Sequence, residues 1–92
     1  MENLEIEKSL VISTGHISKE TADLLELKKI DSLVVEPYEY GWRIHISTDY
    51  KYEEIPDDLK RLMSFADEVF SCSWIRLDQD GPYLDFFKTY DW

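Results

Sequence analysis

Residues 9–27 have the sequence SLVISTGHISKETADLLEL, which predicts a short strand leading directly into an amphipathic helix. The apolar run at residues 10–12, which includes the β-branched Val11 and Ile12, lies between two serines and is typical of a strand buried on both faces. Gly15 ends this strand, and Ser18 is a suitable cap for the helix that follows. Ile17 and Ala22 have the spacing of a hydrophobic staple, which would fix the angle at which the chain enters the helix.

A hairpin is expected next. Residues 33–36 form a short apolar strand that Pro37 is expected to end, and residues 38–41 form a turn. Residues 42–47 alternate with period two, which predicts a strand with Trp42, Ile44 and Ile46 on the core side.

The remainder of the chain predicts a second helix between further strands. A helix begins near residues 55–58, where a proline and two acidic residues stand in the first turn. A strand follows at residues 73–77, and a fifth strand at residues 83–86 follows the turn at Asp80 and Gly81. The order β-α-β-β-α-β-β predicts one α+β domain spanning residues 1–92. We expect a two-layer sandwich in which one mixed or antiparallel sheet carries both helices on one face, related to the split βαβ arrangement.

The chain is strongly acidic, with 20 Asp and Glu residues against 10 Lys and Arg residues and a formal net charge of -10. This charge repels nucleic acids and anionic membranes, so the expected partner is a basic protein and not DNA, RNA or a bilayer. At 43% hydrophobic and 14% aromatic residues, the composition is too apolar for a disordered acidic tail. The absence of a long apolar run and of a secretion signal in the sequence favours the cytoplasm.

Residues that could hold metals or carry out catalysis are sparse. Cys72 is the only cysteine and is expected to be a buried small hydrophobe. His16 and His45 stand in unrelated settings without metal-ligand spacing, so no metal and no cofactor are expected. Residues 78–81 (DQDG) lack the glycine and glutamate spacing of an EF-hand loop and are interpreted as a turn. No serine has a nucleophile-elbow context, so an enzymatic activity is unsupported, although carboxylate chemistry leaves little trace in sequence.

The junction between the first strand and the first helix is the alternative candidate site. Thr14, Gly15 and His16 stand where α/β folds often place ligands, beside the free amide groups of a helix start. Asp78 or Asp80, at the end of a neighbouring strand, would add a carboxylate to a small-ligand or enzymatic site. The competing interpretation has His16 hydrogen-bonding the backbone and fixing the loop, because a single glycine does not make a phosphate loop.

Acidic and aromatic residues alternate in the middle of the chain and again at its end. Residues 49–58 contain five acidic residues, one lysine and two tyrosines, residues 38–42 precede them with two tyrosines and a tryptophan, and residues 85–92 repeat the pattern. Tyrosine and tryptophan supply contact area at interfaces, and carboxylates pair with arginine. The predicted partner-binding residues are Glu39, Tyr40, Asp49, Tyr50, Tyr52, Glu53, Glu54, Asp57 and Asp58. A solvated acidic surface with inward-packed tyrosine rings is the competing interpretation.

Several motifs resemble a known family. They are ISTGHI at residues 12–17, YGW at 40–42, IPDDL at 55–59 and TYDW at 89–92. The chain thereby resembles a family of small bacterial domains of unknown function associated with plasmids, phages and conjugative elements. The resemblance covers nearly the whole chain and implies a self-contained domain without implying a mechanism. By analogy with small acidic proteins of mobile elements, it suggests an inhibitor that mimics phosphate charge and blocks a nucleic-acid-binding defence protein. A homo-oligomer formed through an edge strand or the C-terminal aromatics is a third hypothesis.

Overall fold

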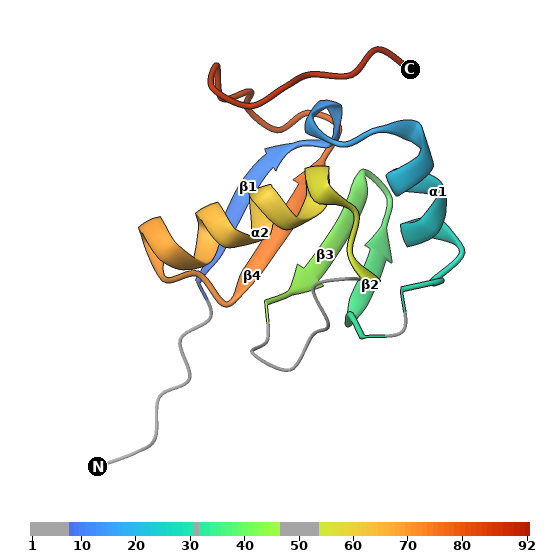
Figure 1. Cartoon of the computed structure of the whole chain (residues 1–92), viewed down its shortest axis with the longest axis horizontal. Coiled ribbons are helices and arrows are strands. Elements are labelled where there is room, and N and C mark those ends of the chain that lie inside the picture. Colours follow the sequence, from blue (N-terminus) through green and yellow to red (C-terminus); the bar gives the residue numbers. More distant parts are fainter. Residues whose placement is uncertain (1–7, 31, 47–53) are drawn as a thin grey trace.

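The structure is a computed structural model that describes residues 8–30, 32–46 and 54–92 (Figure 1). Its elements, in chain order, are β1 (Ser9–Ser13), the 3₁₀ turn η1 (Thr14–His16), α1 (Lys19–Glu26), β2 (Val35–Tyr38), β3 (Gly41–His45), α2 (Asp57–Phe70) and β4 (Trp74–Asp78). The described strands form one mixed sheet in the order β1-β4-β3-β2. β1 is parallel to β4, whereas β4 with β3 and β3 with β2 are antiparallel.

One face of this sheet carries the core. The register pairs Ile12 with Leu77 and Ile44 with Ile75, so these four side chains share a face, and all are fully buried. Ala22 of α1 belongs to the same buried cluster as the sheet residues, and α1 also contributes Leu25, while α2 contributes Leu59, Leu62 and Met63. Both helices therefore cover the same face, as Figure 1 shows for α2 lying across β1 and β4. The predicted two-layer α+β arrangement is confirmed.

The start of α1 follows the prediction closely. The Ser18 hydroxyl accepts a hydrogen bond from the Thr21 amide, so Ser18 is the helix cap. Ile17 and Ala22 are both buried in the core, in keeping with the expected staple. The turn η1 between β1 and α1 was not predicted; the Ser13 hydroxyl caps it by accepting from the Gly15 amide at 2.9 Å.

Strand β2 lies further along the chain than expected. Pro37, predicted to end it, lies inside it and pairs with Trp42 of β3. Because β2 is an edge strand, the missing proline amide costs no ladder hydrogen bond within the sheet. Trp42, Ile44 and Ile46 pack against the core as expected, and Ile46 lies just beyond the end of β3.

The predicted fifth strand is wrong, because residues 83–86 are irregular. Phe86 and Phe87 both contact the ring of Phe65 on α2, with centroid distances of 5.2 Å each. Within the predicted strand, the Leu84 amide donates to the His16 ring at 2.9 Å and not to a neighbouring strand. Instead, the Phe87 amide donates to the Leu84 carbonyl at 3.1 Å and closes a turn.

Candidate functional site

Strand direction determines which strand ends meet around a hollow at one edge of the sheet. β1, β4 and β2 run in one direction, so their carboxyl ends meet at a single edge of the sheet. Thr14, Gln79 and Glu39 directly follow these strands, and all three line a hollow of about 600 Å³. We call this hollow the cleft; it is lined by Thr14, Gly15, Glu26, Tyr38, Glu39, Tyr40, Gly41, Trp42, Gln79, Tyr83, Tyr90, Asp91 and Trp92. The carboxyl edge of a sheet is where open α/β folds bind ligands.

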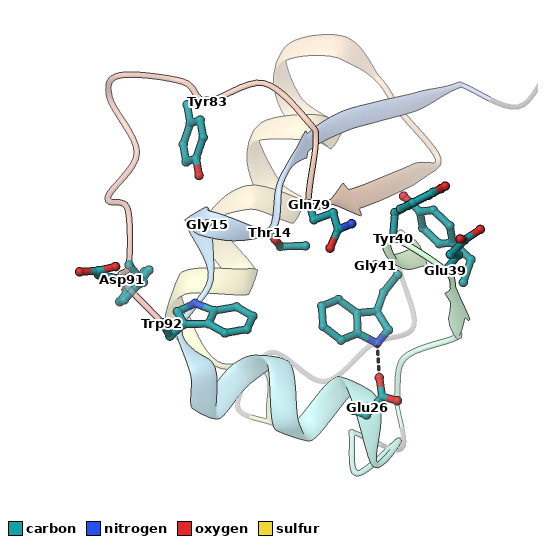
Figure 2. Close-up of a pocket in the computed structure, with 13 residues that line it drawn as sticks. Thr14, Gly15, Glu26, Glu39, Tyr40, Gly41, Gln79, Tyr83, Asp91 and Trp92 are labelled. Carbon is teal, nitrogen blue, oxygen red and sulfur yellow. Dashed lines mark hydrogen bonds between the residues drawn. The ribbon is translucent and has the colours of Figure 1, made fainter.

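The side chains that line the cleft are aromatic and acidic. They include four tyrosines and two tryptophans, and their carboxylates belong to Glu26, Glu39 and Asp91. Figure 2 shows Asp91 and Trp92 on one side of the cleft, Glu39 and Tyr40 on the other, and Thr14 and Gln79 between them. Within the part of the chain that the structure describes, the lining contains no lysine, arginine or histidine. Among the same residues, no cation forms an ion pair with any of the three carboxylates.

One wall of the cleft is made by the C-terminal segment, residues 82–92, which lies along the β1–α1 junction. The Ser13 amide donates to the Pro82 carbonyl at 2.9 Å, and the Tyr90 amide donates to the Gly15 carbonyl at 2.8 Å. The Trp92 indole N–H donates to the Ile17 carbonyl at 2.8 Å. These hydrogen bonds fasten the segment along its length, so Tyr90, Asp91 and Trp92 are held in place beside Gly15.

His16 is the central fastening point of this segment. Its Nε2 accepts from the Leu84 amide at 2.9 Å, and its Nδ1 lies 2.9 Å from the Lys88 carbonyl. An amide can only donate and a carbonyl can only accept, so the ring is neutral, with its proton on Nδ1. The ring is 2% exposed and has edge-to-face contacts with Tyr83 and Phe87. His16 is thus hydrogen-bonded to the backbone on both sides and does not line the cleft, although Thr14 and Gly15 of the same predicted site do.

Asp78 and Asp80, the carboxylates of the predicted ligand site, form a structured strand end. The Tyr38 hydroxyl donates to Asp78 Oδ2 at 2.7 Å, and the Asp80 amide donates to Oδ1 at 2.8 Å. These hydrogen bonds hold the pKa of Asp78 below its usual value. Partial burial and the contact with Asp78 raise the pKa of Tyr38 to about 12. Asp80 itself is exposed, and neither aspartate lines the cleft.

Asp58, one of the predicted partner-binding residues, faces inward and caps α1. Its Oδ2 accepts from the Ser18 amide at 2.7 Å, and the Thr21 hydroxyl donates to both carboxylate oxygens at 2.8 and 2.9 Å. In a capping box, a glutamate at the third helical position would accept from the cap amide. Position 21 is a threonine here, and Asp58 from the first turn of α2 takes over this role across the core. Its carboxylate therefore stabilises the packing of the two helices.

The other predicted partner-binding residues are divided between the cleft and regions away from it. Glu39 and Tyr40 line the cleft. Glu54 and Asp57 are exposed and do not line it, and Asp57 forms an ion pair with Lys60 at 3.3 Å. Asp49, Tyr50, Tyr52 and Glu53 lie outside the described residues. The structure does bring together the acidic aromatic stretches at residues 38–42 and at the chain end, which meet across the cleft.

The remaining candidates have structural roles. His45 lies opposite Trp74 in the sheet register, with ring centroids 4.9 Å apart, and Arg43 stacks over the same indole at 4.1 Å. Cys72 is a buried free thiol, as predicted. Among residues 8–30, 32–46 and 54–92 there is no group of three or more histidine, cysteine or carboxylate side chains placed to hold a metal. No helix in those ranges is long and apolar enough to cross a bilayer.

The predicted site residues include only Thr14, Gly15, Glu39 and Tyr40 of the residues that line the cleft. Most of the others lie in the acidic aromatic stretches at residues 38–42 and 85–92, but Glu26, Gln79 and Tyr83 lie outside these stretches as well. Glu26 is the last residue of α1, and its carboxylate accepts from the Trp42 indole N–H at 3.1 Å. No local pattern indicates that α1 ends beside the β2–β3 turn. Strand direction is the signal that could have found Gln79, because this residue directly follows β4 and the carboxyl ends of β1, β2 and β4 meet at one edge of the sheet.

The chain belongs to a family of unknown function, DUF5983. The model of the C-terminal domain of that family matches residues 9–92, which covers all of the described elements. No curated protein and no solved structure matches the chain.

Proposed function

We propose that this domain binds a basic protein and that the cleft is the centre of the binding surface. The observation that carries the proposal is the composition of the lining, in which three carboxylates and six tyrosine and tryptophan rings gather without a basic side chain among the described residues. Such a surface complements a partner rich in lysine and arginine, and aromatic residues provide the rigid contact area that interfaces favour.

The overall charge supports this choice of partner. A formal net charge of -10 on 92 residues exceeds the magnitude of about 2–8 typical of a soluble small domain. A field of this sign accelerates encounter with a cationic surface and opposes contact with nucleic acids and anionic lipids. Binding is therefore expected to weaken steeply as salt is added, since the Debye length falls to about 8 Å at physiological ionic strength.

The resemblance to domains associated with mobile elements suggests the kind of partner. In this proposal the domain acts in the bacterial cytoplasm as an inhibitor and occupies the basic groove of a nucleic-acid-binding defence protein. In this complex the carboxylates of the cleft take the positions of the phosphates of a bound nucleic acid, and the aromatic rings of the cleft take the positions of its bases. The domain itself contacts neither nucleic acid nor membrane.

A second candidate function is the binding of a small molecule in the same cleft. A volume of about 600 Å³ lies within the usual range of small-ligand pockets, about 300–1,000 Å³. Thr14 and Gly15 of the predicted ligand site line the cleft, as does Gln79, which lies between Asp78 and Asp80. His16 would act only indirectly, by holding the wall in place. No catalytic residue is assigned in this proposal.

Affinity capture with two matched variants tests the proposal. The cleft variant combines Glu26→Gln, Glu39→Gln and Asp91→Asn, which removes three charges and keeps the shapes of the side chains. The control variant combines Asp67→Asn, Glu68→Gln and Asp85→Asn, which removes three exposed charges that do not line the cleft. Each protein is immobilised, incubated with native bacterial lysate at low salt, and eluted with salt.

The expected result is a basic, nucleic-acid-binding protein that the original chain and the control variant retain and the cleft variant does not. Equal retention by both variants would show that net charge alone attracts the partner and that the cleft is not the site. Capture that salt does not reverse, or capture of no basic protein at all, would count against a basic partner and favour the small-molecule alternative.

A further inference from the structure

The two tryptophans of the cleft present their rings and not their N–H groups to an incoming ligand. The Trp92 indole N–H donates to the Ile17 carbonyl, and the Trp42 indole N–H donates to Glu26. Both donors are thus engaged within the protein, yet Trp92 remains 55% exposed. The accessible part of that side chain is aromatic surface, which attracts cations and does not hydrogen-bond to anions.

The carboxylates approach the cleft from three separate elements. Glu26 ends α1, Glu39 lies in the turn between β2 and β3, and Asp91 belongs to the fastened C-terminal segment. The three carboxylates therefore stand on different sides of the cleft and are not confined to one stripe (Figure 2). A ligand with several N–H donors in a plane can satisfy more than one of them at once.

We propose that the cleft takes an arginine side chain of the basic partner, with the planar guanidinium against the exposed Trp92 ring and its N–H groups donating to the surrounding carboxylates. This inference rests on the proposed function and specifies which side chain of the partner is recognised. Guanidinium stacks on aromatic faces and donates in a fixed fork, whereas the ammonium of lysine is a compact and strongly hydrated point charge. A carboxylate ligand would be repelled by the three carboxylates that line the cleft.

The phenylalanine rings of this region form a cluster at α2 that is separate from the cleft. Its members are Phe65, Phe70, Phe86 and Phe87. The aromatic lining of the cleft, by contrast, consists of tyrosine and tryptophan alone. Among aromatic side chains, tryptophan has the ring face most attractive to cations. The cleft therefore concentrates the rings that suit a guanidinium, and the purely apolar rings lie elsewhere.

Titration of the full chain with three small probes tests this inference. N-acetyl-arginine amide carries the guanidinium, N-acetyl-lysine amide an ammonium, and N-acetyl-citrulline amide the neutral isostere of arginine. The readout is the set of indole N–H signals in a nitrogen–proton correlation spectrum. Trp42 and Trp92 report on the cleft, and Trp74, which pairs with His45 on the opposite face of the sheet, is an internal control.

The expected result is a saturable shift of the Trp92 and Trp42 signals with the arginine probe, about five-fold weaker binding of the lysine probe, and no binding of the citrulline probe. Glu39→Gln and Asp91→Asn should weaken the arginine titration, and Asp67→Asn should leave it unchanged. Equal responses to arginine and lysine, a response to citrulline, a shift of Trp74 of the same size, or no shift at all would overturn the inference. If a basic protein is captured through the cleft while the arginine probe fails, the proposed function stands and only the arginine preference falls.

Discussion

Replacing His16 by alanine should both destabilise the domain and release the C-terminal wall of the cleft. The substitution leaves the Leu84 amide and the Lys88 carbonyl without their partner, and each such hydrogen bond is worth about 1 kcal/mol. It also removes edge-to-face contacts with Tyr83 and Phe87, worth about 0.5 kcal/mol each at the lower end of their range. The expected loss in the free energy of unfolding is about 3 kcal/mol, a large fraction of the roughly 5–14 kcal/mol available to a chain of this size.

Urea denaturation gives the change in stability, and amide hydrogen exchange gives its location. Exchange should accelerate at Leu84 and Tyr90 before it changes in the sheet, because the segment can detach while the core stays folded. His45→Ala is the matched control, since that ring lies on the sheet face away from the core and has an edge-to-face contact with Trp74. His16→Asn keeps a donor near Nδ1 and His16→Gln keeps an acceptor near Nε2, so each should recover part of the loss. A cost of His16→Ala below about 1 kcal/mol, with unchanged exchange at Leu84 and Tyr90, would refute the reasoning.

Three further predictions concern caps and titration. Asp58→Ala should cost about 3 kcal/mol in urea denaturation, because it removes the acceptor of the half-buried Ser18 amide and of the buried Thr21 hydroxyl at the start of α1. Asp57→Ala should cost less than about 1 kcal/mol, and similar costs for the two variants would refute the interhelical cap. Ser71→Gly should raise stability by about 0.5–1 kcal/mol, because Ser71 ends α2 with φ 54° in the left-handed region; a loss would contradict this. Burial and the hydrogen bond to Asp78 raise the pKa of Tyr38 from 10.0 to about 12. The neutral hydroxyl therefore stabilises the fold fully below pH 10, and this contribution to the free energy of unfolding is lost as the pH rises toward 12. Tyr38→Phe should abolish that alkaline loss. The pKa of Asp78 is lowered, so its effect on stability has the opposite dependence on pH. The ionised carboxylate stabilises the fold above pH 3.8, and this contribution is lost as the pH falls further.

Local patterns in the sequence predicted the parts of the fold that depend on neighbouring residues. The Ser18 cap and the core side of β3 follow from spacing within a few residues, and both were confirmed. The fifth strand was wrong because Phe86 and Phe87 are held by Phe65, a contact across about twenty residues that no local pattern encodes.

The candidate site depends on contacts that are still more distant. The pairing of β1 with β4 joins residues 9–13 to 74–78, and it decides which strand ends meet at the cleft. Composition drew attention to Glu39, Tyr40 and the C-terminal aromatics Tyr90 and Trp92, which the structure places in the lining of the cleft. It could not distinguish the outward Glu39 from the inward Asp58, because both are acidic residues in polar segments. The difference is made by two donors of α1 that lie opposite Asp58 only in the folded chain.

The most direct test of the cleft as the binding site is a map of backbone amide shifts on adding an oligo-arginine peptide at low salt. We expect the changes to concentrate at residues 14–15, 38–42, 79 and 90–92, and to fade as salt is added. Changes of equal size at the exposed acids Asp67 and Glu68 of α2 would show that the peptide spreads over the acidic surface. That result would contradict a cleft that recognises its partner.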